Sequence, residues 1–181
     1  MCKIEQVRPL IWELTELDLP PIPPQDQWRT AGLFTEGEIS NAQLREIYHF
    51  PVLRESWGII SDKVLHLIRN LDLNELWQGY NVNLKPFDTI GLCIHKDLPN
   101  FNMHGHHDNR RVIGAIIVNL VDNKDPTTFL NYTSPTERNT GIFFLNDPTT
   151  RHAVRNTSDR DRITAYQNIF IDSFFKGTSN A

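Results

Sequence analysis

The segment Val112 to Val121 most constrains the fold, because its residues are apolar at both alternating sets of positions. In a strand, alternate side chains point to opposite faces, so a strand with one solvated face alternates between apolar and polar residues. A strand whose two faces are both apolar must pack against other parts of the protein on both sides. We therefore predict a strand over this segment that is buried on both faces.

The chain from residue 86 onward has the pattern of short strands separated by turns. Asp122–Pro126, Ser134-Pro135 and Asn146–Pro148 carry the residues that favour turns. The predicted strands are Phe87–His95, Arg111–Val121, Thr127–Tyr132, Gly141–Leu145, Arg151–Val154 and Arg162–Asp172. Short strands with helices only upstream predict a mainly β chain with N-terminal helices, folded as an antiparallel jelly roll or barrel.

The first 85 residues have a different character. Leu19 to Pro24 is too rich in proline for a helix or a central strand and should be an extended connection. Ser40 is the expected N-cap of a helix over Asn41–His49, and an amphipathic helix is expected from Glu55 to Leu71. We expect a single domain, 1–181, in which residues 1–85 form an extended segment and supporting helices for a core of residues 86–175.

Composition removes several classes of protein. The two cysteines, Cys2 and Cys93, form no CxxC pair, so neither a disulfide framework nor a thiolate zinc site is expected. A net charge of −4 without a basic cluster disfavours nucleic-acid binding. No apolar run is long enough to span a membrane, and the first eight residues do not resemble a secretory signal. We expect a cytoplasmic chain without membrane contact, and the sequence does not indicate its oligomeric state.

The densest group of potential metal ligands is His104-Gly105-His106-His107-Asp108. On an extended chain, His106 and Asp108 project to one side and His107 to the other. His152, on a short predicted strand, could add a third ligand. Two histidines and one carboxylate on one side of a metal form the ligand set of non-haem Fe(II) oxygenases. His104 shares the face of His106, so those two could be the pair instead, and the spacing does not distinguish iron from zinc.

The predicted strand Arg162–Asp172 separates polar from apolar side chains. One face carries Arg162, Thr164, Tyr166 and Asn168, and the other carries Ile163, Ala165, Ile169 and Ile171. The polar face suits the wall of a wet cavity, where a guanidinium and a neighbouring hydroxyl can bind a carboxylate. The alternative is a surface ion pair between Arg162 and Asp159 or Asp161.

These segments resemble the motif of Fe(II)/2-oxoglutarate-dependent dioxygenases: HxD, a distal His, and Arg-x-Ser/Thr about ten residues later. The matching segments are His106-His107-Asp108, Arg151-His152-Ala153-Val154 and Arg162-Ile163-Thr164, within residues 87–172. Gly141–Leu145 leading to Arg151–Asn156 is similar to the prolyl-hydroxylase-like and amino-acid-hydroxylase-like branches. The resemblance implies a double-stranded β-helix, which is a cupin-like jelly roll.

The resemblance also implies roles for single residues. His106, Asp108 and His152 would bind Fe(II), Arg162 would pair with the far carboxylate of 2-oxoglutarate, and Thr164 would hydrogen-bond the same group. One more polar contact is expected, from Tyr132, with Asn131, Asn102 and Tyr166 as alternatives.

The implied reaction is hydroxylation by O2 of a small molecule, or of an amino-acid or peptidyl side chain, releasing succinate and CO2. Ascorbate is an optional reductant in such a reaction. The competing interpretation is a cupin-like metal-binding isomerase or a non-catalytic ligand-binding module. Neither of these requires an arginine and a hydroxyl ten and twelve residues after the last metal ligand, so Arg162 and Thr164 distinguish the two interpretations.

Overall fold

The computed structural model of the chain describes residues 2–35, 44–71, 92–108 and 112–170, and within these ranges the protein is mainly β. The first strands are β1 (Lys3–Arg8), β2 (Ile11–Thr15), β3 (Arg29–Thr35) and β4 (Leu44–His49). The later strands are β5 (Leu92–Asp97), β6 (Asn102–His106), β7 (Val112–Asn119), β8 (Thr127–Phe129), β9 (Tyr132–Thr133), β10 (Gly141–Leu145), β11 (His152–Arg155) and β12 (Arg162–Phe170). The helices are α1 (Arg54–Arg69) and the short 3₁₀ helices η1 (Gln25–Gln27), η2 (Pro51–Leu53) and η4 (Pro148–Thr150).

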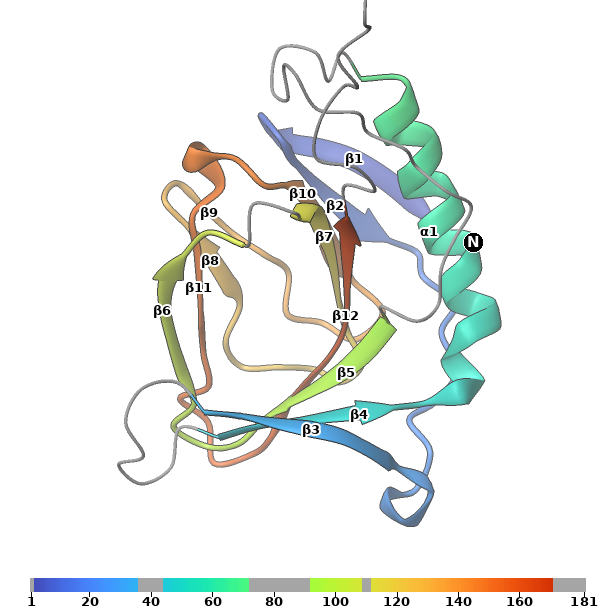
Figure 1. Ribbon diagram of the computed structural model, residues 1–181, viewed down its shortest axis with the longest axis vertical. Helices are drawn as coiled ribbons and strands as arrows, with labels where there is room; N and C mark the ends of the chain where they lie inside the picture. The colour runs from blue at the N-terminus through green and yellow to red at the C-terminus, as the bar shows by residue number, and fades with distance from the viewer. Residues whose placement is uncertain (1, 36–43, 72–91, 109–111, 171–181) are drawn as a thin grey trace, which may run out of the picture.

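The strands form two antiparallel sheets. The large sheet has the order β1-β2-β10-β7-β12-β5-β4-β3, and the small sheet has the order β6-β11-β8-β9. Figure 1 shows the small sheet on the side of the molecule opposite α1, with the central strands of the large sheet between them. The large sheet therefore has one face toward the helix and one face toward the small sheet.

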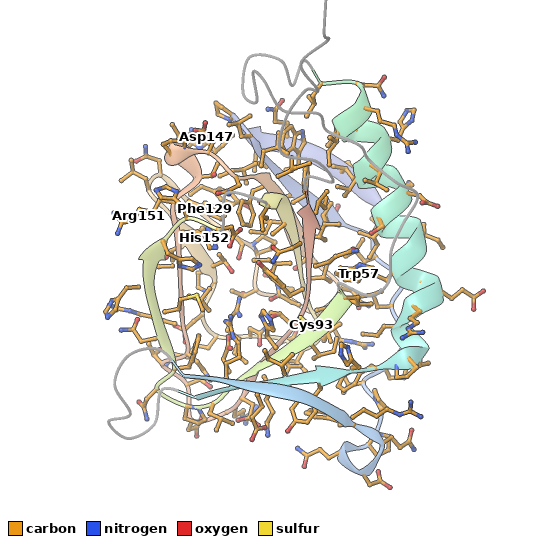
Figure 2. All side chains as sticks on the ribbon, in the orientation of Figure 1. Trp57, Cys93, Phe129, Asp147, Arg151 and His152 are labelled. Atoms are coloured by element: carbon orange, nitrogen blue, oxygen red, sulfur yellow. The ribbon has the colours of Figure 1, made fainter. Side chains whose placement is uncertain are left out.

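Two hydrophobic clusters correspond to these two faces. The larger cluster joins one side of α1, including Trp57 and Val64, to side chains such as Phe143 of the large sheet. Trp57 projects from the helix toward the sheet (Figure 2). The smaller cluster lies between the sheets and includes Ile117 and Phe144. Apolar burial on both sides of the large sheet holds the framework together.

Strand β7 confirms that the central apolar segment is buried on both faces. Every residue from Val112 to Asn119 is buried. Ile116 and Val118 belong to the cluster under α1, whereas Ala115 and Ile117 belong to the cluster between the sheets. The alternation of a strand therefore distributes this one segment over both cores.

The prediction for the first third of the chain was partly wrong. The amphipathic helix is confirmed as α1, but the expected helix over Asn41–His49 is not formed, because Leu44–His49 is strand β4. Ser40, its expected N-cap, lies outside the described residues. A nine-residue pattern is short enough to fit either a helix or a strand. Leu44–His49 forms a strand because it pairs with β3 on one side and β5 on the other. Strands β1 and β2 were not expected either, and they extend the large sheet beyond β10.

Most later strands lie where the sequence predicts them. The strand Gly141–Leu145 is confirmed as β10, and the strands predicted to begin at Arg151 and Arg162 correspond to β11 and β12. Residues 87–91, Arg111 and residues 171–172, which belong to three predicted strands, lie outside the described part of the chain. The segment Thr127–Tyr132 is not one strand but the short hairpin β8–β9, and β6 was not predicted. In the described ranges, no helix combines the length and hydrophobicity needed to cross a membrane.

Candidate metal centre

Strand pairing brings three potential metal ligands together. His106 ends β6, and His152 begins β11 directly opposite it, since the two residues are paired in the small sheet. Asp108 follows two residues after His106. One ligand atom from each of these three side chains lies within 4.8 Å of the other two. The structure thus gathers the three residues that the sequence motif names as ligands, and His104 is not in this group.

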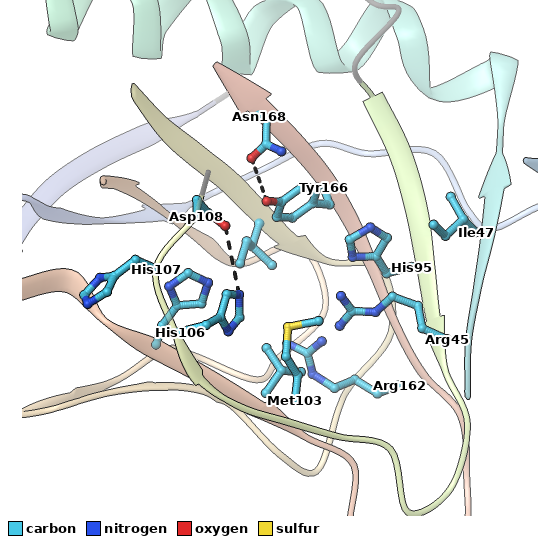
Figure 3. Close-up of a pocket in the computed structure, with 13 residues that line it drawn as sticks. Arg45, Ile47, His95, Met103, His106, His107, Asp108, Arg162, Tyr166 and Asn168 are labelled. Atoms are coloured by element: carbon cyan, nitrogen blue, oxygen red, sulfur yellow. Dashed lines mark hydrogen bonds and ion pairs between the residues drawn. The ribbon is translucent and has the colours of Figure 1, made fainter. Parts of the chain in front are cut away.

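Both imidazole rings are oriented by backbone carbonyl groups. Nδ1 of His106 lies 3.0 Å from the carbonyl oxygen of His104, and Nδ1 of His152 lies 3.3 Å from that of Thr150. A proton on Nδ1 satisfies each carbonyl and leaves Nε2 as the lone-pair nitrogen. Nε2 of His106 lies 4.0 Å from Oδ1 of Asp108 (Figure 3). These contacts orient both rings so that the Nε2 atoms are the nitrogens available to a metal.

The electrostatics of the cluster suit a divalent cation. Oδ2 of Asp108 is buried and has no hydrogen-bond partner among the described residues, and burial raises the pKa of this carboxyl. Burial also lowers the pKa of His152 to about 4, because the ring packs between Phe129 and Phe144. An unpartnered buried carboxylate oxygen is costly unless a cation or a donor reaches it. The donor set of two imidazoles and one carboxylate fits Fe(II), and other divalent transition metals equally.

A cavity of ≈ 440 Å³ lies beside the cluster, within the usual range for small-molecule sites. Its walls come from strands of both sheets, including β4, β5 and β12 of the large sheet and β6 and β11 of the small sheet. The lining residues are Arg45, Ile47, His95, Met103, His106, His107, Asp108, Ile117, His152, Val154, Arg162, Tyr166 and Asn168. The cavity therefore connects the three candidate ligands with two arginines.

Arg162 is buried at this cavity and does not form the surface ion pair considered above with Asp159 or Asp161. It is 3% exposed, and its Nη1 donates to Oδ2 of the fully buried Asp97 at 3.0 Å. Nη2 donates to Thr127 Oγ1 at 3.1 Å, and Nε donates to the carbonyl of Asp125 at 3.2 Å. Burial lowers the pKa of Arg162, and the charge of Asp97 opposes that shift. A buried, oriented guanidinium of this kind can bind a carboxylate.

Two other predicted contacts of the co-substrate are not among the lining residues of the cavity. Thr164 is 1% exposed and is not among the residues that line the cavity. Tyr132 does not line it either, because its hydroxyl donates to Glu13 Oε1 at 2.7 Å. Tyr166, one of the alternatives, does line the cavity, and its hydroxyl donates to Asn168 Oδ1 at 2.6 Å. His107 is exposed at the rim and points away from the ligand cluster (Figure 3).

Sequence reasoning missed three residues near this cavity, namely Arg45, His95 and Asp97. A signal for the last two exists, because β5 alternates apolar Leu92 and Ile94 with Cys93, His95 and Asp97. Such a pattern marks a strand with one polar inner face, as in β12. Arg45 had no comparable signal, since its segment was predicted to be helical.

Comparison with protein-family models and with curated proteins found no match to this chain.

Proposed function

We propose that this chain is a non-haem Fe(II)- and 2-oxoglutarate-dependent oxygenase that hydroxylates a small molecule, or an amino-acid or peptidyl side chain. The observation that carries the proposal is a single cavity with His106, Asp108 and His152 at one place and the buried Arg162 at another. A dicarboxylate that chelates a metal needs both features. A cupin-like isomerase or a simple binding module needs only the three metal ligands and not the buried arginine.

Strand order supports a double-stranded β-helix for the described residues 92–108 and 112–170. Strands β5, β7, β10 and β12 are adjacent in the large sheet, whereas β6, β8, β9 and β11 form the small sheet. The chain passes repeatedly from one sheet to the other, as it does in a jelly roll, and the cavity lies between the two sheets. This topology agrees with the fold that the motif resemblance implies.

Fe(II) bound with 2-oxoglutarate and O2 would supply an oxidant for an unactivated C–H bond, with release of succinate and CO2. The residues of the chain have simpler tasks. His106, Asp108 and His152 would hold the metal, and the carbonyl contacts at Nδ1 of the two histidines orient their rings so that Nε2 is the atom that would bind it. Arg162 would hold the far carboxylate of the co-substrate. Met103, Ile117 and Val154 give part of the cavity wall an apolar surface, which would disfavour water beside the reacting groups.

A thermal-shift experiment with Mn(II) and 2-oxoglutarate tests both halves of the site. Mn(II) should raise the Tm of the wild type, and 2-oxoglutarate at about 100 times its Kd should raise it by a further 5–10 °C, roughly. His152→Ala should lose both responses, whereas Arg162→Met should lose only the second. His66→Ala, at an exposed position of α1, is the matched control and should behave as the wild type. A wild-type protein that responds to neither addition would refute the proposal.

A further inference from the structure

A second arginine lies beside Arg162 in the cavity wall. Arg45, on β4, is 7% exposed and donates to both oxygens of Asp97, through Nε and, at 3.0 Å, through Nη2. Asp97 Oδ2 also accepts from Arg162, so one fully buried carboxylate contacts two guanidinium groups. Figure 3 shows both arginine side chains projecting toward the part of the cavity where Met103 lies.

Strand register explains this arrangement. Asp97 on β5 is paired directly with Arg162 on β12 and with Arg45 on β4. The three side chains therefore form one row across the inner face of the large sheet. We call these three residues the arginine–aspartate row. Because its members are placed by strand pairing and not by loops, both guanidinium groups are oriented before any ligand arrives.

The row carries more positive than negative charge. Two guanidinium groups face one carboxylate, and the neighbouring His95 adds no charge, because burial and the two arginines lower its pKa well below its usual value. Among the described lining residues, the only carboxylate is Asp108, which belongs to the metal cluster. Within the described residues, two of the five N–H groups of Arg45 and three of those of Arg162 have hydrogen-bond acceptors. Among the residues that the structure describes, one net positive charge and several N–H donors thus remain for an anion.

We propose that Arg45 is a specificity-determining residue that binds, together with Arg162, one carboxylate of a dicarboxylate ligand. The inference rests on the proposed function only for the identity of that ligand as 2-oxoglutarate. Asp97 positions both guanidinium groups and cancels one of their charges, so the row binds one carboxylate and not two. Arg45 would thus provide the second contact to the carboxylate. The sequence motif assigns that contact to Thr164, which is not among the lining residues of the cavity.

The test compares a dicarboxylate with its closest monocarboxylate. Kd values for 2-oxoglutarate and for 2-oxobutanoate, which lacks the far carboxylate, are measured with Mn(II) present. Arg45→Met should weaken 2-oxoglutarate binding by about 10- to 100-fold and leave 2-oxobutanoate within about twofold. Arg45→Lys keeps the charge but loses the planar fork, and should fall between Met and the wild type. Arg54→Met, at an exposed position of α1, should change neither Kd.

Folding of each variant is checked by circular dichroism. Arg45→Met still leaves Asp97 paired with Arg162, and Arg45→Lys provides the test if the Met variant does not fold. Folded Arg45 variants that bind 2-oxoglutarate as tightly as the wild type would overturn the inference while leaving the proposed oxygenase intact. Conversely, the metal-free wild type could bind glutarate while the Arg45→Met variant does not. That result would support the proposed role of Arg45 even if the wild type released no succinate. A wild type that binds neither dicarboxylate would overturn the inference.

Discussion

At the scale of single residues, the candidate site contains buried polar groups that lower the stability of the fold, so their presence calls for a functional explanation. Asp108 keeps a buried carboxylate oxygen without a partner among the described residues, and His152 is a buried imidazole held in one orientation. Buried polar groups usually have hydrogen bonds, and exceptions gather where a protein binds a ligand. The unpartnered oxygen of Asp108 therefore suits the proposed cation on grounds that do not depend on the sequence motif.

Replacing Asp108 with Asn should change metal binding and stability in opposite directions. Mn(II) affinity should fall by roughly 100-fold or more, because loss of a supporting contact alone costs about 10- to 100-fold. In metal-free protein, the same change removes a poorly solvated charge and should raise the free energy of unfolding by about 1 kcal/mol. Isothermal titration with Mn(II) and urea unfolding measure the two effects. The exposed Asp62→Asn serves as control, and a metal-free Asp108→Asn protein less stable than the wild type would contradict this account.

The grouping of His106, Asp108 and His152 was predictable from the sequence, whereas the arginine–aspartate row was predictable only in part. The alternation that places His106 and Asp108 on one side is local, so two-residue spacing was enough to predict it. The contact between Arg45 and Asp97 joins residues 52 positions apart on strands whose pairing no local pattern reveals. The side chain of Tyr132 suits a polar contact with the co-substrate, but its hydroxyl donates to Glu13 on β2, a partner that the sequence does not reveal.

At the scale of secondary-structure elements, close approach of β7 and β10 depends on glycine. A Cβ added at Gly114 would lie 2.4 Å from the carbonyl oxygen of Phe144, and one added at Gly141 would lie 2.2 Å from that of Ile117. These contacts are to backbone atoms, which cannot rotate away. The same two strands carry apolar side chains of both cores, so their spacing affects the whole framework.

Alanine should therefore have opposite effects at two glycines. Gly114→Ala should lower the free energy of unfolding by about 1–3 kcal/mol, as overpacking does. At Gly58 in α1, an added carbon would meet no atom within 4 Å outside its chain neighbours and the backbone of the helix. Gly58→Ala should raise the free energy of unfolding by about 0.5–1 kcal/mol, because glycine is a poor helix residue. Denaturant unfolding of both variants measures the difference. Equal effects of the two substitutions would contradict the described packing.

Helix α1 is joined to β12 by a buried polar contact on the face away from the cavity. Trp57 Nε1 donates to Gln167 Oε1 at 2.7 Å, and Ser61 Oγ donates to the same oxygen at 2.9 Å. Gln167→Leu removes this acceptor and should cost about 1–3 kcal/mol of unfolding free energy. In a double-mutant cycle with Ser61→Ala, the combined cost should be smaller than the sum. Strictly additive costs, or a changed 2-oxoglutarate affinity, would contradict the arrangement.

At the scale of the whole molecule, the β class and the polar inner face of β12 followed from period-two patterns, but the extent of the large sheet did not. Strands β1 to β4 attach to both ends of that sheet, and their places depend on partners remote in the sequence. Leu44–His49 is an example. Its short sequence pattern fits a helix or a strand, and it forms a strand because it pairs with β5. The N-terminal region thus supplies a wall of the cavity, through Arg45 and Ile47, in addition to the supporting helix.

Because two hydrophobic clusters pack against the two faces of the large sheet, we expect the fold to form without a metal. Removal of metal with EDTA should leave the far-ultraviolet circular dichroism spectrum unchanged, since apolar packing holds both sheets and the ligand rings are oriented by backbone carbonyls. The Tm should fall by the several degrees that bound metal had added, and Mn(II) should restore it. Loss of the β spectrum on chelation would indicate a metal-dependent fold of the zinc-finger kind instead.

The most direct test of the proposed oxygenase is succinate formation from 2-oxoglutarate under air, with Fe(II) and ascorbate. The wild type should release succinate, and chelation, His152→Ala or Arg162→Met should each abolish or nearly abolish the release. The exposed His66→Ala variant should match the wild type. Succinate formation that persists in folded His152→Ala, or a metal-loaded wild type that binds 2-oxoglutarate but never forms succinate with any substrate screened, would contradict the account.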